Sequence, residues 1–107
     1  MMVSTTNEIA GHRVARHLGM CRGITVRSRS VVGNWLGGLQ SVFGGKIGVY
    51  VRLAEQAREE AYRHMVDHAA QAGANAVIGM RYDANEIMDG ITEVLAYGTA
   101  VVVEPMP

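Results

Sequence analysis

Three residues close together in the chain, His64, Asp67 and His68, could bind a metal ion. Histidines four residues apart lie on one face of an α-helix, and helical pairs of this kind bind zinc in known sites. A helix over this segment places His68 near the middle of its apolar stripe, His64 beside it and Asp67 at its edge. The spacing therefore indicates a site for a divalent transition metal. Two histidines hydrogen-bonded to the backbone or to a neighbouring chain explain the same spacing, and we favour this second interpretation because the sequence shows no further ligand to complete a site.

The chain contains one cysteine, Cys21. A single cysteine excludes an intramolecular disulfide and any CxxC redox or zinc motif. His17 precedes it by four residues, but four residues of a β-strand span about 13 Å, which is too far for both side chains to bind one ion. Simple burial is the interpretation of Cys21 that we favour.

Catalytic motifs are missing from the sequence. The segment GGKIG at residues 44–48 lacks the spacing of a phosphate-binding loop, and no GxGxxG motif opens a helix. Neither a hydrolase nucleophile elbow nor a fixed pair of carboxylates is present. We therefore predict that the protein is not an enzyme, and catalysis by an interfacial histidine with Asp67 is the least favoured alternative.

The charges are segregated along the chain although the net charge is zero. The stretch between Glu8 and Glu55 contains no acidic residue but many basic ones: Arg13, Arg16, Arg22, Arg27, Arg29, Lys46 and Arg52. One hypothesis is an adaptor that binds a polyanion or a partner protein through this basic N-terminal strand. The other is that basic strands pair with acidic elements of the same or a neighbouring subunit. The neutral total favours the second hypothesis, so nucleic acid is not an expected partner.

Hydrophobic periodicity predicts the elements that position these residues. Residues 12–29 alternate as in a strand, in which Gly19 and Gly23 indicate a bulge, a bend or a close backbone approach. Arg16 and Arg22 share the parity of the apolar residues, so we expect a register shift inside this strand. The apolar positions of that parity are Val14, Leu18, Met20, Ile24 and Val26.

The rest of the chain shows helical and strand patterns in turn. Gly73 follows the longest helical pattern and is a natural C-cap. One stripe of that helix is rich in small apolar residues: Tyr50, Leu53, Ala54, Ala57, Ala61, Met65 and Ala72. The predicted elements after the first strand are a helix over 30–43, a turn over 44–48, a helix over 49–72, a strand over 76–83, a turn over 84–90 and a strand over 91–104.

The chain has room for one domain, residues 1–107, of the α+β class. Its order is β-α-α-β-β, in which the last two strands form a hairpin and the long helix covers one face of a small antiparallel sheet. The other face and both edges remain uncovered, and exposed edges favour pairing with another copy. No signal peptide is visible in the first residues and no apolar stretch reaches the ~18 residues of a membrane span, so we expect a cytoplasmic protein without membrane contact.

Several segments resemble the YbjQ-like family: Ser4–Thr6, Gly44–Tyr50, Ala57–Arg58, Gly73–Met80 and Tyr97–Val101. The resemblance covers nearly the whole chain and is most specific in the long helix and the GANAVIGMRYD segment after it. It implies a dodecin-like fold that assembles into a homopentameric ring, in a family described as "putative heavy-metal-binding". The pair His64 and His68 lies outside the family pattern. We therefore predict a non-enzymatic homo-oligomer, a pentamer on the strength of the resemblance, that binds a heavy metal or a small ligand where its subunits meet.

Overall fold

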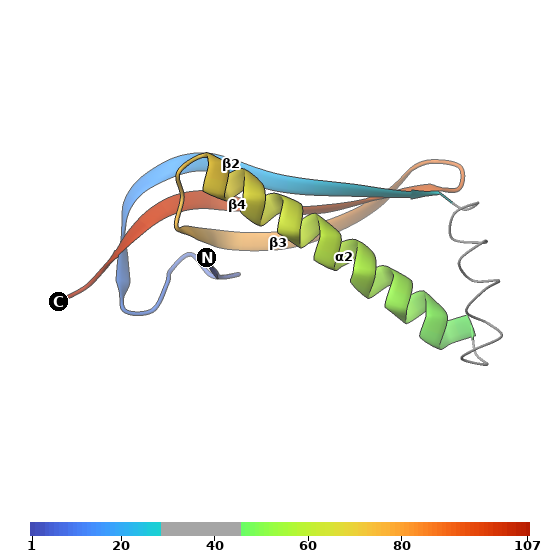
Figure 1. Cartoon of the computed structure of the whole chain (residues 1–107), viewed down its shortest axis with the longest axis horizontal. Coiled ribbons are helices and arrows are strands. Elements are labelled where there is room, and N and C mark those ends of the chain that lie inside the picture. Colours follow the sequence, from blue (N-terminus) through green and yellow to red (C-terminus); the bar gives the residue numbers. More distant parts are fainter. Residues whose placement is uncertain (29–45) are drawn as a thin grey trace.

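The computed structural model of the chain describes residues 1–28 and 46–107, which form a four-stranded sheet with one long helix across a face of it (Figure 1). The sheet order is β1-β3-β4-β2; β1 runs parallel to β3, and the other neighbours are antiparallel. The α+β class and a long helix packed on the sheet are therefore confirmed. The elements are β1 (Met2–Val3), β2 (His12–Ser28), α2 (Lys46–Gln71), β3 (Ala76–Met88) and β4 (Ile91–Pro105).

Two features of the structure differ from the sequence prediction: the strand β1 and the position at which α2 begins. The short β1 was not predicted, and its parallel pairing makes the sheet mixed instead of purely antiparallel. The helix predicted over 30–43 lies outside the described residues. Part of the predicted turn over 44–48 is helical, because α2 begins at Lys46. A glycine inside a helix costs only about 1 kcal/mol, so a helix of this length tolerates Gly48 near its start.

The hairpin of β3 and β4 is longer than its sequence indicates. Residues 84–88 were predicted as part of a turn, but β3 continues through them to Met88, and only a tight turn at Asp89 and Gly90 separates it from β4. Alanine, asparagine and glutamate have low strand propensity, yet Ala84 pairs with Val94 and Glu86 with Thr92. Pairing with the long, valine-rich β4 outweighs the local preference of these residues.

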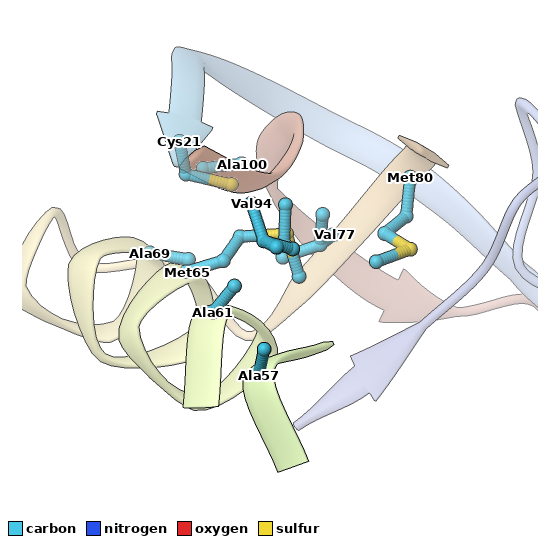
Figure 2. Packing of buried hydrophobic residues seen from close by; sticks show 10 residues of the cluster. Cys21, Ala57, Ala61, Met65, Ala69, Val77, Met80, Val94 and Ala100 are labelled. Carbon is cyan, nitrogen blue, oxygen red and sulfur yellow. The ribbon is translucent and has the colours of Figure 1, made fainter. Parts of the chain in front are cut away.

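The core lies between α2 and the strands beneath it, as Figure 2 shows. Four helix residues spaced by four, Ala57, Ala61, Met65 and Ala69, are each at most 4% exposed. Because three of them are alanines, the helix backbone can approach the sheet closely. Their partners on the strands include Cys21, Val77, Met80, Val94, Ala96 and Ala100. A smaller cluster lies on the opposite face of the sheet, where Ile9 and Val14 pack against Ala76, Ile78, Val101 and Val103.

Gly19 and Gly23 of β2 both have structural roles of the kind that the sequence predicted. Gly19 has a φ of 102°, a left-handed value that favours glycine, and a register shift separates it from His17. Gly23 lies directly under α2, where an added Cβ would be well under 3.0 Å from the carbonyl oxygen of Ala61 and the amide nitrogen of Met65. The expected register shift and the close backbone approach in this strand are therefore confirmed.

The parity of β2 places its large apolar residues away from the helix. Cys21, Gly23 and Thr25 are buried beneath α2, whereas the side chains between them belong to the opposite side of the sheet. We call this side the helix-free face; it carries Met20, Ile24 and Val26 of β2, which are 43–62% exposed. The register pairs these residues with Thr99, Leu95 and Glu93 of β4.

The two halves of α2 differ in burial although one apolar stripe runs along both. Ala57 and Met65 of the predicted stripe are buried, but Tyr50 is 48% exposed and Ala54 is exposed as well. In Figure 1 the N-terminal end of α2 diverges from the strands, which accounts for this difference. The C-terminal end is capped as predicted: Gly73 has a φ of 94°, and the amide of Ala74 donates to the carbonyl oxygen of Ala69 at 3.0 Å.

Candidate functional site

His64 and His68 of α2 lie along the outer edge of β2. This strand is the last of the sheet, so every second residue directs its backbone N–H and C=O away from β4. The amide of Arg22 donates to Nδ1 of His68 at 3.0 Å. Nδ1 of His64 lies 3.2 Å from the carbonyl oxygen of Ile24. The two imidazoles thus satisfy backbone groups that an edge strand would otherwise leave open.

The partners of the two rings fix opposite tautomers. A carbonyl oxygen only accepts, so Nδ1 of His64 carries a hydrogen and, in the neutral ring, Nε2 keeps its lone pair. An amide only donates, so Nδ1 of His68 is the acceptor and its hydrogen is on Nε2. Metal-binding histidines commonly donate their second N–H to a carbonyl oxygen, which is the arrangement of His64. His68 would have to give up its bond to Arg22, or change its tautomer, to bind a metal.

The predicted metal ligands are neighbours on the helix but do not form a closed metal site within one copy. Asp67 is exposed, as are His64 and His68. In the two described stretches, 1–28 and 46–107, no three or more His, Cys, Asp or Glu side chains are grouped so that they could hold a metal ion. The donor set of one chain therefore supplies one well-oriented imidazole, His64, and needs further ligands to complete a site.

Cys21 is a buried core residue. Its side chain is 1% exposed, and its thiol donates to the carbonyl oxygen of Gly98 at 3.6 Å. Burial raises the pKa of this thiol, so the thiolate, which is the nucleophilic and metal-binding form, is disfavoured. The structure thus agrees with simple burial of Cys21.

Two arginines of the basic strand pair with acidic residues of the same copy. Arg13 of β2 forms an ion pair with Glu104 of β4, and Arg27 forms one with Glu60 of α2. Arg16 and Arg22 are exposed. Part of the charge segregation seen in the sequence is therefore matched inside the subunit, as the second hypothesis for the basic strand predicted.

Arg27 joins β2 to α2 near the point where the helix diverges. Its Nη1 donates to the hydroxyl of buried Thr25 at 2.7 Å, and its Nη2 donates to the carboxylate of Glu60. The hydrogen bond from Arg27 lowers the pKa of Glu60, against a smaller opposing effect of desolvation. The carboxylate form of Glu60 is therefore favoured in the folded chain.

We expect the Glu60→Gln variant to lose less than about 1 kcal/mol of unfolding free energy at pH 7, because the ion pair is partly exposed. The lowered pKa of Glu60 sets the sign of the pH dependence. Its stabilisation is present above the pKa of an unfolded glutamate, about 4.3, and disappears as the pH falls through the lower folded pKa. Wild type and variant should converge in urea denaturation once the pH falls below the folded pKa of Glu60. Glu55→Gln, at an exposed site on the same helix, is the control, and a difference that stayed unchanged in acid would contradict the assignment.

Among the hollows of the described surface, two are lined by residues other than His64, Asp67 and His68. One, of about 320 Å³, lies among residues 7–14 and Met106. The other, of about 240 Å³, lies on the helix-free face between Arg22 of β2 and Asp83 of β3, over Leu95 and Tyr97 of β4. The second hollow was not predicted from the sequence. The one sequence signal for it was the alternation of β2 and β4, which places these side chains on one face of the sheet.

The chain matches the model of the YbjQ family, described as "Putative heavy-metal-binding", over residues 1–104. It is 62% identical over 105 residues to a UPF0145 protein of Chromobacterium violaceum, an alignment that spans 98% of this chain and 90% of that one. It is 63% identical over 100 residues to a UPF0145 protein of Paraburkholderia phymatum, spanning 94% and 90%.

A crystal structure of a Pediococcus pentosaceus protein of unknown function, of the DUF74 family, has the same kind of fold. Its TM-score is 0.63 over 97% of this chain and 98% of that one, at 14% sequence identity. An identity this low supports a likeness of fold and nothing further. None of these names indicates an enzymatic activity. The chain belongs to the YbjQ family, and the relatives named above carry the name UPF0145 protein.

Proposed function

We propose that the protein is a non-enzymatic homo-oligomer that binds a heavy metal ion or a small ligand where its copies meet. The exposed area of one copy supports assembly. A single chain exposes 6779 Å², whereas a compact monomer of 11.5 kDa exposes about 5,800 Å². Its radius of gyration is 17.0 Å, against about 13 Å for a compact domain of this length. Burial against other copies would remove this excess surface. We propose five subunits for this assembly, and that number rests on the family resemblance.

Metal binding is proposed from the family description together with the orientation of His64. Imidazole suits zinc, copper and nickel, and Nε2 of His64 is the nitrogen that the structure leaves with a lone pair. Asp67, three residues further along α2, and His68 are the candidate neighbours. One chain does not gather three such ligands within its described residues, so a second copy would complete the coordination. A bound ion of this kind would link copies together.

Native mass spectrometry tests both parts of the proposal, because it reports the number of subunits and any retained ion together. We expect purified wild type, supplied with zinc, copper or nickel, to give a pentamer that carries a stoichiometric ion. His64→Ala should weaken metal binding by at least roughly tenfold, since it removes the oriented donor. Gln71→Ala, at an exposed position of the same helix that is not among the proposed ligands, should retain the ion and serves as the matched control.

Each part of the proposal has its own contrary result. A monomer at micromolar concentration would contradict assembly. Unchanged affinity in a variant that lacks both His64 and His68 would remove the proposed ligands. Loss of the ion in His68→Ala but not in His64→Ala would show that the wrong histidine has been assigned.

A further inference from the structure

The turn between β3 and β4 consists of two residues, Asp89 and Gly90. Both lie outside the paired strands, whose last pair before the turn is Met88 with Ile91. Gly90 has a φ of 76°, a left-handed value that glycine adopts readily. Asp89 is exposed, and in Figure 1 the turn lies at the opposite end of the sheet from both termini. The hairpin thus ends in an aspartyl-glycyl bond on the surface.

The amide of Gly90 donates to a side chain of β3. Its nitrogen lies 3.1 Å from Oε1 of Glu86, a residue that is itself exposed. The carboxylate of a glutamate accepts hydrogen bonds and can also take up a proton, as it does when it acts as a general base. The backbone nitrogen that follows Asp89 is therefore in contact with a proton acceptor.

We propose that Asp89 and Gly90 form a site of covalent self-modification, at which aspartate rearranges to isoaspartate with Glu86 as the proton acceptor. In the first step the nitrogen of Gly90 attacks Cγ of Asp89 in its acid form, while Glu86 removes the proton of that nitrogen. Glu86 then returns the proton to the departing hydroxyl group. A bond forms between the nitrogen and Cγ, the bond between Cγ and the hydroxyl oxygen breaks, one water leaves, and a cyclic succinimide remains.

Hydrolysis of the succinimide is the second step. One water adds to one of the two ring carbonyl carbons and breaks the bond of that carbon to the ring nitrogen. Attack on Cγ restores aspartate. Attack on the main-chain carbonyl carbon leaves the chain linked through Cγ, which is isoaspartate with a free α-carboxylate. The water lost in the first step is replaced in the second, so the rearrangement consumes neither an oxidant nor a cofactor.

Local structure favours the rearrangement at Asp89 over Asp83, which lies in the same hairpin. Closure of the succinimide requires rotation about the bond between Cα and the main-chain carbonyl carbon of the aspartate. Asp83 pairs with Leu95 and is held extended, although the amide nitrogen of Ala84 lies 3.0 Å from its Oδ1. Asp89 lies outside the paired strands, and Gly90 has no Cβ to obstruct its nitrogen. Asp83 therefore provides an internal comparison.

The rearrangement would alter the end of the hairpin. The main chain of isoaspartate passes through the side chain, so the turn gains one main-chain atom, and a new α-carboxylate appears on the surface. A turn of two residues fixes the register of the strands that it joins. We expect the pairs nearest the turn, Met88 with Ile91 and Glu86 with Thr92, to separate, while the core around Met65 stays folded.

Incubation of the full chain over weeks in water enriched in heavy oxygen tests this proposal, which depends on neither subunit number nor metal. Peptide mapping by mass spectrometry should find isoaspartate and the heavy label at residue 89, and unmodified aspartate at residue 83. Glu86→Gln keeps an oxygen that accepts the amide hydrogen but cannot take the proton. It should accumulate isoaspartate at least roughly tenfold more slowly than wild type. Glu55→Gln is the matched control and should accumulate it at the wild-type rate.

Three results would overturn the proposal. The first is a folded chain that gains no isoaspartate while a synthetic peptide with the sequence of residues 84–93 gains it under the same conditions. The second is an equal or faster rate in Glu86→Gln with an unchanged circular dichroism spectrum, which would mean that the contact of Glu86 protects the turn. The third is an equal amount of label at Asp83, since the turn would then not determine where the chain rearranges.

Discussion

The Gly23→Ala variant is expected to lose about 3 kcal/mol or more of unfolding free energy, which is a large part of the stability of a small domain. The added Cβ would lie 2.7 Å from Cβ of His64 and well under 3.0 Å from two backbone atoms of α2, the oxygen of Ala61 and the nitrogen of Met65. Backbone atoms inside a helix cannot move alone. Relief therefore requires the whole helix to rise from the sheet, which loosens the core below it.

The same substitution at Gly48 provides a control with the opposite sign. Gly48 lies inside α2, and a Cβ added there meets nothing within 4 Å. Alanine is the better helix former by roughly 0.8–1 kcal/mol, so Gly48→Ala should be neutral or stabilising. Urea denaturation at one fixed protein concentration measures both variants, because assembly would otherwise shift the apparent stability. A loss below about 1 kcal/mol for Gly23→Ala would contradict the close contact of β2 and α2.

The sequence predicted the elements of this fold better than it predicted which side of β2 is covered. Alternation identified β2, and the glycine after the long helix identified its end. Hydropathy, however, ranks Met20, Ile24 and Val26 as core residues, while the helix covers Cys21, Gly23 and Thr25 instead. The reason is steric: a helix face of alanines packs closest against small side chains. The sequence shows which of the two alternating sets of β2 residues has the smaller side chains. Which set faces α2 depends on how closely the strand and the helix pack, and these two segments are far apart in the chain.

For the candidate metal site, too, the sequence predicted part of the arrangement: it predicted that the two histidines lie together, but not which groups they contact. The spacing of His64 and His68 placed both on one helix face, and the structure places both at one strand edge. The helical position of His68 suggested the interior, but the ring is exposed because β2 is the outermost strand and the helix lies over its edge. Their different backbone partners, Arg22 and Ile24, could not be predicted, since they depend on the register between α2 and β2. Because of that register, Nδ1 of His68 accepts from a backbone amide and Nδ1 of His64 donates to a carbonyl oxygen, although their spacing on the helix makes the two histidines look equivalent.

Met65→Ala is the second variant with a large expected effect. Met65 is 0% exposed and points from α2 into the middle of the core in Figure 2. Its truncation should cost about 2–5 kcal/mol of unfolding free energy, through lost burial and the cavity that remains. Met106→Ala, at a site that is 52% exposed, should change stability by less than about 0.5 kcal/mol. If urea denaturation showed similarly small losses of unfolding free energy for Met65→Ala and Met106→Ala, the packing of α2 on the sheet would be contradicted.

A double variant that combines Gly23→Ala with Met65→Ala distinguishes crowding between side chains from the close approach of the two backbones. A cavity beside an oversized residue can relieve crowding when the crowded atoms are side-chain atoms. The Cβ of Gly23→Ala instead meets the backbone nitrogen of Met65, which truncation of that side chain does not remove. The double variant should therefore be no more stable than Gly23→Ala alone. Partial rescue by Met65→Ala would mean that side-chain crowding, and not the approach of the two backbones, determines how close α2 lies to β2.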